Sequence, residues 1–217
     1  MTEAGHQRKV AFAAALISLV LVVAFGLVSG ISESGAPLPV DLAWMNLVAA
    51  ESTGGWTIPS LVLHEVGAGW PAFLIATAIT GALLLWGRPW GAVFFIAAAV
   101  VSTAVVEVLK NSIARPRPTD ALIEVGFGSY PSGHSARAAM IAVAVGILVP
   151  RLWVWMLGAA YTLAMMFSRT QLGAHWLTDT IAGALVGAAV AALCFVLVAP
   201  RLQVEGARGH RPVWSEG

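Results

Sequence analysis

The segment SRTQLGAHWLTD, residues 168–179, places an arginine, a histidine and a carboxylate just ahead of a long apolar run. The run reaches Ala199 with no charged residue after Asp179. Since a membrane-spanning helix needs about 20 predominantly apolar residues, the sequence predicts such a helix over 175–199. Charged side chains in or beside a membrane segment are costly to keep there, which makes those of 168–179 candidates for a functional site.

The composition extends the membrane prediction to the whole chain. Of its 217 residues, 59% are hydrophobic and only 11% are charged, whereas soluble proteins carry roughly a quarter charged residues. No large polar block interrupts the sequence, which favours a single membrane domain over 1–217. The net charge is +1 without a solvated basic stripe, so a nucleic acid is not expected as a partner.

The apolar runs predict an all-α fold, a polytopic bundle of six transmembrane helices with a flexible cytoplasmic tail. The first run could instead be a secretory signal peptide, but it is longer than the roughly 7–15 apolar residues of a cleaved signal. Residues 41–51 form either a short interfacial helix or an ordered loop. Gly183 and Gly187 predict close packing within the bundle rather than dimerisation. The expected spans are 10–31, 58–86, 90–113, 133–149, 152–168 and 175–199, and the tail is 201–217.

The basic residues predict the orientation of this bundle in a cell (plasma) membrane. Six spans put both termini on one side, and loops rich in Lys and Arg face the cytoplasm. Both termini are therefore expected in the cytoplasm. The polar stretches 110–118, 131–134 and 168–179 are expected on the extracytoplasmic side. The basic residues on the cytoplasmic side would be Arg8, Lys9, Arg88, Arg151, Arg201, Arg208 and Arg211.

The string KNSIARPRP, residues 110–118, supplies further cations at the end of another apolar run. Lys110 and Arg117, joined by Arg169, would gather three permanent cations in the outer layer of the bundle, and an anion is their natural guest. A guanidinium can offer a bidentate fork to phosphate oxygens. Taken alone, Lys110 could simply snorkel to the membrane interface.

The string PSGH, residues 131–134, opens the predicted helix 133–149. Ser132 is a good N-cap residue, Gly133 lets another group approach the backbone closely, and free amides at a helix start can bind an anion. His134 then lies in the first turn, facing whatever those amides hold. An interfacial histidine next to a capping serine is the alternative when this string is taken alone.

His175 and Asp179 are four residues apart, so on a helix they would share one face and lie within hydrogen-bond reach. A carboxylate that binds one imidazole nitrogen fixes the tautomer and leaves the other nitrogen free to attack. The pair could also simply hold two helices together. Another interpretation adds His134 to make a metal site with two histidines and one carboxylate, but the nearby cations disfavour a divalent ion. We therefore expect neither a metal nor a cofactor.

Together the strings resemble the three-part signature of the type 2 phosphatidic acid phosphatase (PAP2) superfamily, which also includes the vanadium haloperoxidases. Every signature position agrees with the pattern, and the three parts span about a third of the chain. The first part matches at Lys110, Arg117 and Pro118, the second at 131–134, and the third at Ser168, Arg169, His175 and Asp179.

The resemblance implies a membrane lipid phosphatase and a role for each site residue. His175 would be the nucleophile that forms a phosphohistidine, Asp179 would orient it, and His134 would protonate the leaving group. The expected substrate is polyprenyl diphosphate first, then phosphatidylglycerol phosphate or phosphatidic acid. A lipid phosphotransferase, a transporter and a haloperoxidase are the alternatives, and the sequence does not indicate an oligomeric state. The groups expected to hold the phosphoryl oxygens are Lys110, Arg117, Arg169, Ser132 and Gly133.

Overall fold

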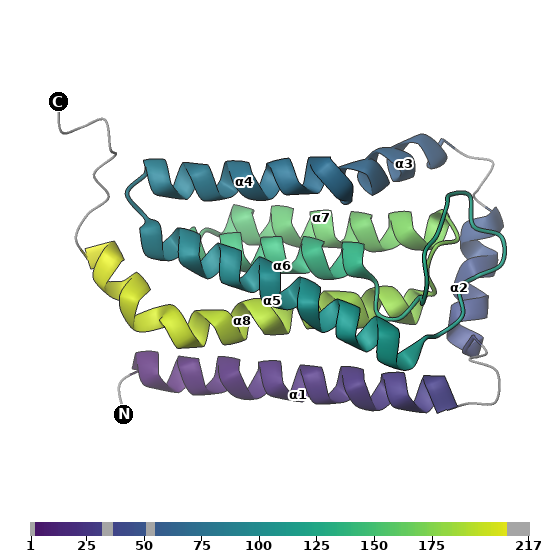
Figure 1. Cartoon of the computed structure of the whole chain (residues 1–217), viewed down its shortest axis with the longest axis horizontal. Coiled ribbons are helices and arrows are strands. Elements are labelled where there is room, and N and C mark those ends of the chain that lie inside the picture. Colours follow the sequence, from purple (N-terminus) through teal and green to yellow (C-terminus); the bar gives the residue numbers. More distant parts are fainter. Residues whose placement is uncertain (1–2, 32–36, 51–54, 208–217) are drawn as a thin grey trace.

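Eight α-helices make up the part of the chain that the structure, a computed structural model, describes: residues 3–31, 37–50 and 55–207 (Figure 1). Those residues contain no strand, which confirms the all-α prediction. The helices are α1 (Glu3–Ile31), α2 (Pro39–Ala50), α3 (Thr57–Val66), α4 (Gly69–Leu85), α5 (Pro89–Ile113), α6 (Gly133–Leu148), α7 (Leu152–Gln171) and α8 (Leu177–Ala207).

Three helices are long and apolar enough to cross a membrane, namely the Arg8–Ser29 part of α1, α5 and α8. The pair of α3 and α4 is a fourth candidate, and α6 is a shorter apolar helix of 16 residues. Length and composition thus support three or four crossings, and the six spans stay a prediction.

The predicted span 58–86 is wrong as one continuous helix, because α3 and α4 meet at a bend of 60°. Gly69 begins α4 with a φ of +50°, a conformation that glycine adopts without steric cost. On the other side of the break, a Cβ at Gly67 would lie only 2.8 Å from side-chain atoms of His134 and Met165. The bend therefore seats the end of α3 against α6 and α7.

The centre of the bundle is the contact between α6 and α8. A Cβ at Gly183 of α8 would overlap the carbonyl oxygen of Ser132, and a Cβ at Gly187 would overlap that of Ala136. The two helix backbones therefore touch along this glycine pair, as close helix packing in membranes requires. The prediction that Gly183 and Gly187 serve packing within the bundle is confirmed.

The predicted flexible tail 201–217 is wrong for its first seven residues, because α8 continues through Pro200 to Ala207. Glu205 explains the extra turns: its carboxylate accepts hydrogen bonds from the amides of Trp90 (2.6 Å) and Gly91 (3.3 Å) at the start of α5. A carboxylate at a helix N-terminus is stabilised by free N–H groups and by the helix dipole. Residues 208–217, with Arg208 and Arg211, lie outside the described residues.

One end of the bundle collects all three polar strings (Figure 1). There α5 and α7 end, α6 and α8 begin, and α2 lies across the helix ends. Of the two alternatives for 41–51, the helix is the one that forms, as part of α2; Glu51 lies outside the described residues. The start of α1 and the end of α8 lie at the opposite end. The chain therefore brings distant strings together without burying them in the middle of the bundle.

The glycine contact predicts a sharp difference between two similar substitutions. Gly187→Ala should lower the free energy of unfolding by about 1–3 kcal/mol, because the new methyl group forces α6 and α8 apart. Gly81→Ala is the matched control: Gly81 lies in α4 with open space around its Cβ position, and alanine there should be neutral or slightly stabilising. Thermal unfolding in detergent measures both, and equal midpoints would contradict the packing role.

Candidate active site

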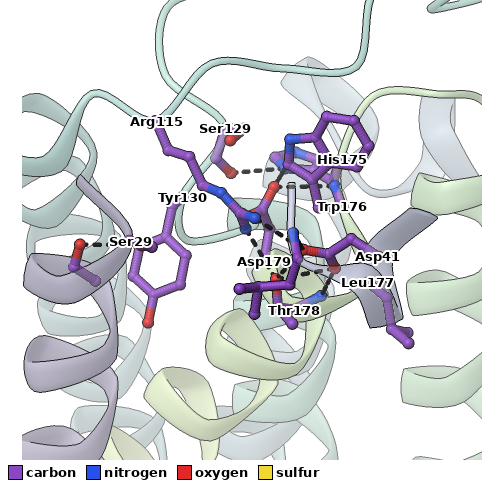
Figure 2. A network of polar contacts seen from close by, with 12 residues as sticks. Ser29, Asp41, Arg115, Ser129, Tyr130, His175, Trp176, Leu177, Thr178 and Asp179 are labelled. Atoms are coloured by element: carbon purple, nitrogen blue, oxygen red, sulfur yellow. Dashed lines mark hydrogen bonds and ion pairs between the residues drawn. The ribbon is translucent and has the colours of Figure 1, made fainter. Parts of the chain in front are cut away.

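A buried ion-pair network joins α2 to the start of α8 (Figure 2). Nη2 of Arg115 lies 2.8 Å from Oδ2 of Asp41, and Nη1 lies 2.6 Å from Oδ1 of Asp179. All three side chains are 0% exposed. Asp41 also accepts a hydrogen bond of 2.9 Å from the amide of Thr178. No role was predicted for Arg115 or Asp41 from the sequence. The signal for Asp41 was a lone carboxylate in an otherwise apolar helix.

Asp179 also forms half of a capping box at the start of α8. Its Oδ2 accepts a hydrogen bond of 2.9 Å from the amide of Trp176, the residue just before the first helical position, Leu177. An acidic residue at the third helical position commonly reaches back in this way. His175 therefore lies before the helix, and the expectation that His175 and Asp179 share a helix face is wrong.

The nitrogen Nδ1 of His175 is bound by a backbone carbonyl rather than directly by the carboxylate. Nδ1 lies 2.7 Å from the carbonyl oxygen of Ser129, whereas Oδ2 of Asp179 is 3.7 Å away. A carbonyl oxygen only accepts, so Nδ1 carries the proton and Nε2 carries the lone pair. Nη1 of Arg117, which can only donate, lies 3.3 Å from that Nε2. Both contacts select the same tautomer.

Ser129 is itself held firmly in place. Its amide donates to the carbonyl of Arg115 (2.8 Å), and its hydroxyl donates to that of Pro116 (3.0 Å). The hydroxyl of its neighbour Tyr130 donates to the carbonyl of Val22 in α1 (2.7 Å). The loop between α5 and α6, which carries Arg115 and Arg117, thus also fixes the direction of His175. Residue types alone do not reveal this link.

His175 is 2% exposed, and this determines its charge. Burial lowers the pKa of the imidazole from its ordinary value of 6.5 to about 4, and the carboxylate of Asp179 offsets only part of that effect. Removing the imidazole from water disfavours its charged form. At neutral pH, His175 therefore has an uncharged imidazole with a free lone pair on Nε2.

The three cations predicted as a phosphate site lie at the same end of the bundle, and Arg117 contacts this imidazole. Arg117 donates to the carbonyls of Ala174 (2.6 Å) and Gly126 (2.8 Å), and Lys110 lies along Gly128, where a Cβ would come within 2.8 Å of its Cγ. Arg117 and Arg169 each act electrostatically on Lys110. Within the described residues, none of the three has a carboxylate oxygen within 4.0 Å. Arg115, by contrast, has two.

The PSGH string forms the start of α6 as predicted, but its serine behaves differently from expectation. Ser132 is the N-cap residue, yet its hydroxyl makes no capping hydrogen bond. The hydroxyl instead accepts a bond of 3.2 Å from Ser135, while the amide of Ser132 donates to the carbonyl of Asp179 (3.0 Å). The first amides of α6 therefore have no side-chain cap, and Gly133 is partly exposed there.

His134 contacts His64, a residue for which the sequence predicted no role. Its Nε2 lies 3.3 Å from Nδ1 of His64 in α3, and the same Nδ1 lies 2.9 Å from Nη1 of Arg169. The sequence contained no signal for this meeting, because the bend between α3 and α4 creates it. The metal interpretation of His134, His175 and Asp179 is not favoured, since Arg115 and Trp176 already occupy both oxygens of Asp179.

An apolar cavity of about 840 Å³ runs from this site along the side of the bundle between α4, α5 and α6. Gly133, Arg137 and Glu107 line it beside the site. Further along, its walls are mainly apolar or small side chains, among them Phe73, Leu84, Phe95, Ile96, Ala99, Val100, Met140 and Ile141. The polar site thus adjoins an apolar channel of substantial volume.

Comparison with known proteins agrees with this arrangement. The family model of the PAP2 superfamily matches residues 91–203, which include every signature residue and the site around His175. The chain belongs to the PAP2 superfamily. The resemblance predicted from the three strings is confirmed.

Two relatives illustrate the likeness in sequence. A lipid A 1-phosphatase of Rhizobium johnstonii is 33% identical over 172 residues, covering 73% of this chain and 68% of the relative. An undecaprenyl-diphosphatase of Sulfolobus acidocaldarius is 37% identical over 75 residues, covering 35% of this chain. The chain spans only about a third of the length of that second relative, 32%.

The fold also has a close counterpart among solved structures. The PAP2-type phosphatidylglycerolphosphate phosphatase from Bacillus subtilis, a transmembrane protein, superimposes with a TM-score of 0.71 at 22% sequence identity. The match covers 85% of this chain and 96% of that one. At this level of identity the likeness establishes a membrane PAP2 fold for the chain.

The ion-pair network predicts that Asp41 is needed for stability although it lies outside the signature. Asp41→Ala leaves Arg115 buried with one carboxylate instead of two, and removing one partner of a buried pair costs about 3–5 kcal/mol. Asp120→Ala, an exposed carboxylate in the loop, is the control and should change little. We expect a lower midpoint of thermal unfolding in detergent for Asp41→Ala only; identical midpoints would show that the network is not stabilising.

Proposed function

We propose that the chain is a membrane lipid phosphatase that hydrolyses a lipid phosphate or diphosphate through a phosphohistidine, without a metal. The observation that supports this proposal most directly is the contact between Arg117 and the neutral imidazole of His175, at the end of the bundle that also holds Lys110 and Arg169. Among the described residues, none of these three cations has a carboxylate oxygen within 4.0 Å. Three oxygens of a phosphoryl group would supply the missing negative charge. The phosphorus would then lie within reach of the His175 lone pair.

The first chemical step is attack by Nε2 of His175 on phosphorus. The bond from phosphorus to the leaving oxygen breaks, and His134 gives that oxygen a proton. Charge on the equatorial oxygens is stabilised by Lys110, Arg117 and Arg169, and fixed charges of this kind supply most of the catalysis in phosphoryl transfer. In the second step, water gives a proton to His134 and attacks the phosphohistidine. Inorganic phosphate leaves, and both histidines return to their starting states.

The apolar cavity supports a lipid as the substrate. A chain lying between α4, α5 and α6 would stay among apolar side chains while its phosphate reached Gly133 and the cations beyond. A lipid phosphate of this kind would not have to leave the bilayer to react. Moving an apolar chain into water costs about 0.8 kcal/mol for each CH₂, and a substrate whose chain stays in apolar surroundings avoids this cost.

Polyprenyl diphosphate is the substrate that we favour, followed by phosphatidylglycerol phosphate and phosphatidic acid. The undecaprenyl-diphosphatase among the relatives supports a polyprenyl diphosphate as substrate, and the lipid A 1-phosphatase supports a lipid phosphate more generally. We further propose that the site faces away from the cytoplasm. Arg88 and Arg151 lie in the turns at the end of the bundle opposite the site, as the positive-inside rule requires for that orientation.

A phosphate-release panel on purified protein tests this function. We expect release from polyprenyl diphosphate, polyprenyl phosphate, phosphatidylglycerol phosphate or phosphatidic acid, undiminished by excess EDTA and inhibited by vanadate. His175→Ala should abolish release, because no other group can form the covalent intermediate. Activity that is lost on chelation and restored by a divalent ion would contradict the mechanism. Phosphoryl transfer to a second lipid without phosphate release would establish a phosphotransferase instead.

The pH at which His175 becomes protonated can be predicted without knowing the substrate. Because its pKa is lowered to about 4, the imidazole should stay neutral from pH 7 down to about pH 5 and become protonated only as the pH falls through about 4. Protonation removes the attacking lone pair, so turnover should fall in the same range. NMR titration of isotopically labelled histidine measures the midpoint, with His175→Gln identifying the signal. A midpoint near 6.5 would contradict the buried, neutral nucleophile.

A further inference from the structure

His64 links two residues of the proposed phosphate site from outside the family signature. Its Nδ1 lies 2.9 Å from Nη1 of Arg169 and 3.3 Å from Nε2 of His134. That Nε2 is also 3.3 Å from the backbone oxygen of His64. The two imidazole rings face each other with centroids 5.2 Å apart and a tilt of 35°. One residue of α3 thus contacts both α6 and α7 at the site.

The chemistry of these contacts fixes the tautomers. A guanidinium has donors and no acceptor, so Nδ1 of His64 must present its lone pair to Arg169. The backbone oxygen of His64 likewise only accepts. Both groups of His64 near Nε2 of His134 are therefore acceptors, although Nδ1 shares its single lone pair with Arg169. Nε2 of His134 must carry a proton to bind either of them.

The position of Gly67 shows which edge of the His134 ring faces α3. A Cβ at Gly67 would lie 2.8 Å from Cδ2 of His134. Cδ2 and Nε2 are neighbours in the ring, so the edge that they form faces α3. Nδ1 and Cε1 form the opposite edge and face away from α3. His134 therefore has one nitrogen beside His64, and Nδ1 lies on the side of the ring away from α3.

We propose that His64 is a positioning residue that holds His134 as the Nε2–H tautomer, so that Nδ1 of His134 exchanges protons with the substrate. The inference rests on the proposed phosphatase function. In the first step, the Nδ1–H bond of the His134 imidazolium breaks as the O–H bond of the leaving group forms. Nε2 of His134 keeps its proton throughout, with that proton hydrogen-bonded to His64. Nδ1, now with a lone pair, then takes the proton of the water that attacks the phosphohistidine.

The surroundings explain why His134 needs such a partner. The charged and titratable groups that face the two rings are Arg169 of α7, Arg137 of α6, His175 ahead of α8 and Glu65 of α3. Burial disfavours the imidazolium of His134 most, and the two cations add to this effect. The single carboxylate belongs to an exposed side chain. A neutral acceptor at Nε2 partly offsets this repulsion, since a hydrogen bond to the charged form favours it.

Leaving-group dependence separates this role from a merely structural one. The two substrates are a long-chain alkyl phosphate and a nitrophenyl phosphate with the same alkyl chain, whose nitrophenolate leaves without a proton. General acid catalysis contributes about 10²–10⁴-fold, so His64→Leu should slow the alkyl substrate by about tenfold or more and the aryl substrate much less. His64→Gln, which keeps an acceptor, should retain most activity. Val62→Ala, at an exposed position of α3, is the matched control and should behave as wild type.

The pH profile gives a second readout. For the alkyl substrate, His64→Leu should move the alkaline limb of kcat/KM to lower pH, because the protonated imidazole of His134 loses the side-chain acceptor and keeps only the backbone oxygen. Equal losses on both substrates with an unmoved alkaline limb would overturn the role of His64 and leave the phosphatase function intact. Wild-type protein that releases phosphate from neither substrate would refute the phosphatase function itself.

Nitrogen-15 NMR of labelled histidine tests the tautomer directly and requires no variant of His64. At a pH where His134 is neutral, its Nε2 should give the signal of a protonated nitrogen and its Nδ1 that of an unprotonated one. His134→Gln identifies the two signals. The opposite tautomer would overturn the proposal even if His64→Leu failed to fold.

Discussion

The buried pairing of Arg115 with Asp41 and Asp179 is the constraint on which the site depends. The two carboxylates outnumber the guanidinium, and the start of α8 offsets the difference: Asp41 accepts from the amide of Thr178, and Asp179 from that of Trp176. The negative charge of the two carboxylates is thus balanced by the guanidinium and by the amides at the start of α8, although all three side chains are buried. One network therefore holds α2 in place, stabilises the start of α8 and fixes the position of His175 just before that helix.

Two arginines in one loop have opposite surroundings, and this contrast separates structure from chemistry. Arg115 has two carboxylates and is fully buried, whereas Arg117, two residues on, binds only backbone carbonyls and Nε2 of His175. Pro116 stands between them and fixes φ at that point. Residue type alone does not distinguish the two arginines. Their partners do, because a cation already neutralised by carboxylates has little attraction left for a phosphate.

Much of the architecture was predictable because apolar runs and breaks are local properties of the sequence. The all-α fold, the gathering of the three strings at one end and the packing role of Gly183 and Gly187 follow from such patterns. The contact of Ser129 with His175 was not predictable, since a backbone carbonyl has no signature in a sequence. Nor was the approach of His64, which depends on the bend between α3 and α4.

The location of the charges argues for chemistry at a membrane surface rather than transport through it. A transporter site is expected near the middle of the bilayer on broken helices. Here Lys110 and Arg169 lie at the ends of α5 and α7, His134 at the start of α6, and Arg117 in a loop at the same end. The one broken pair, α3 and α4, contributes His64 to this end. Charges at a helix end remain close to water, where they are cheapest to keep, while the adjoining cavity extends among apolar residues. A ligand that is ionic at one end and apolar along the rest matches both environments at once.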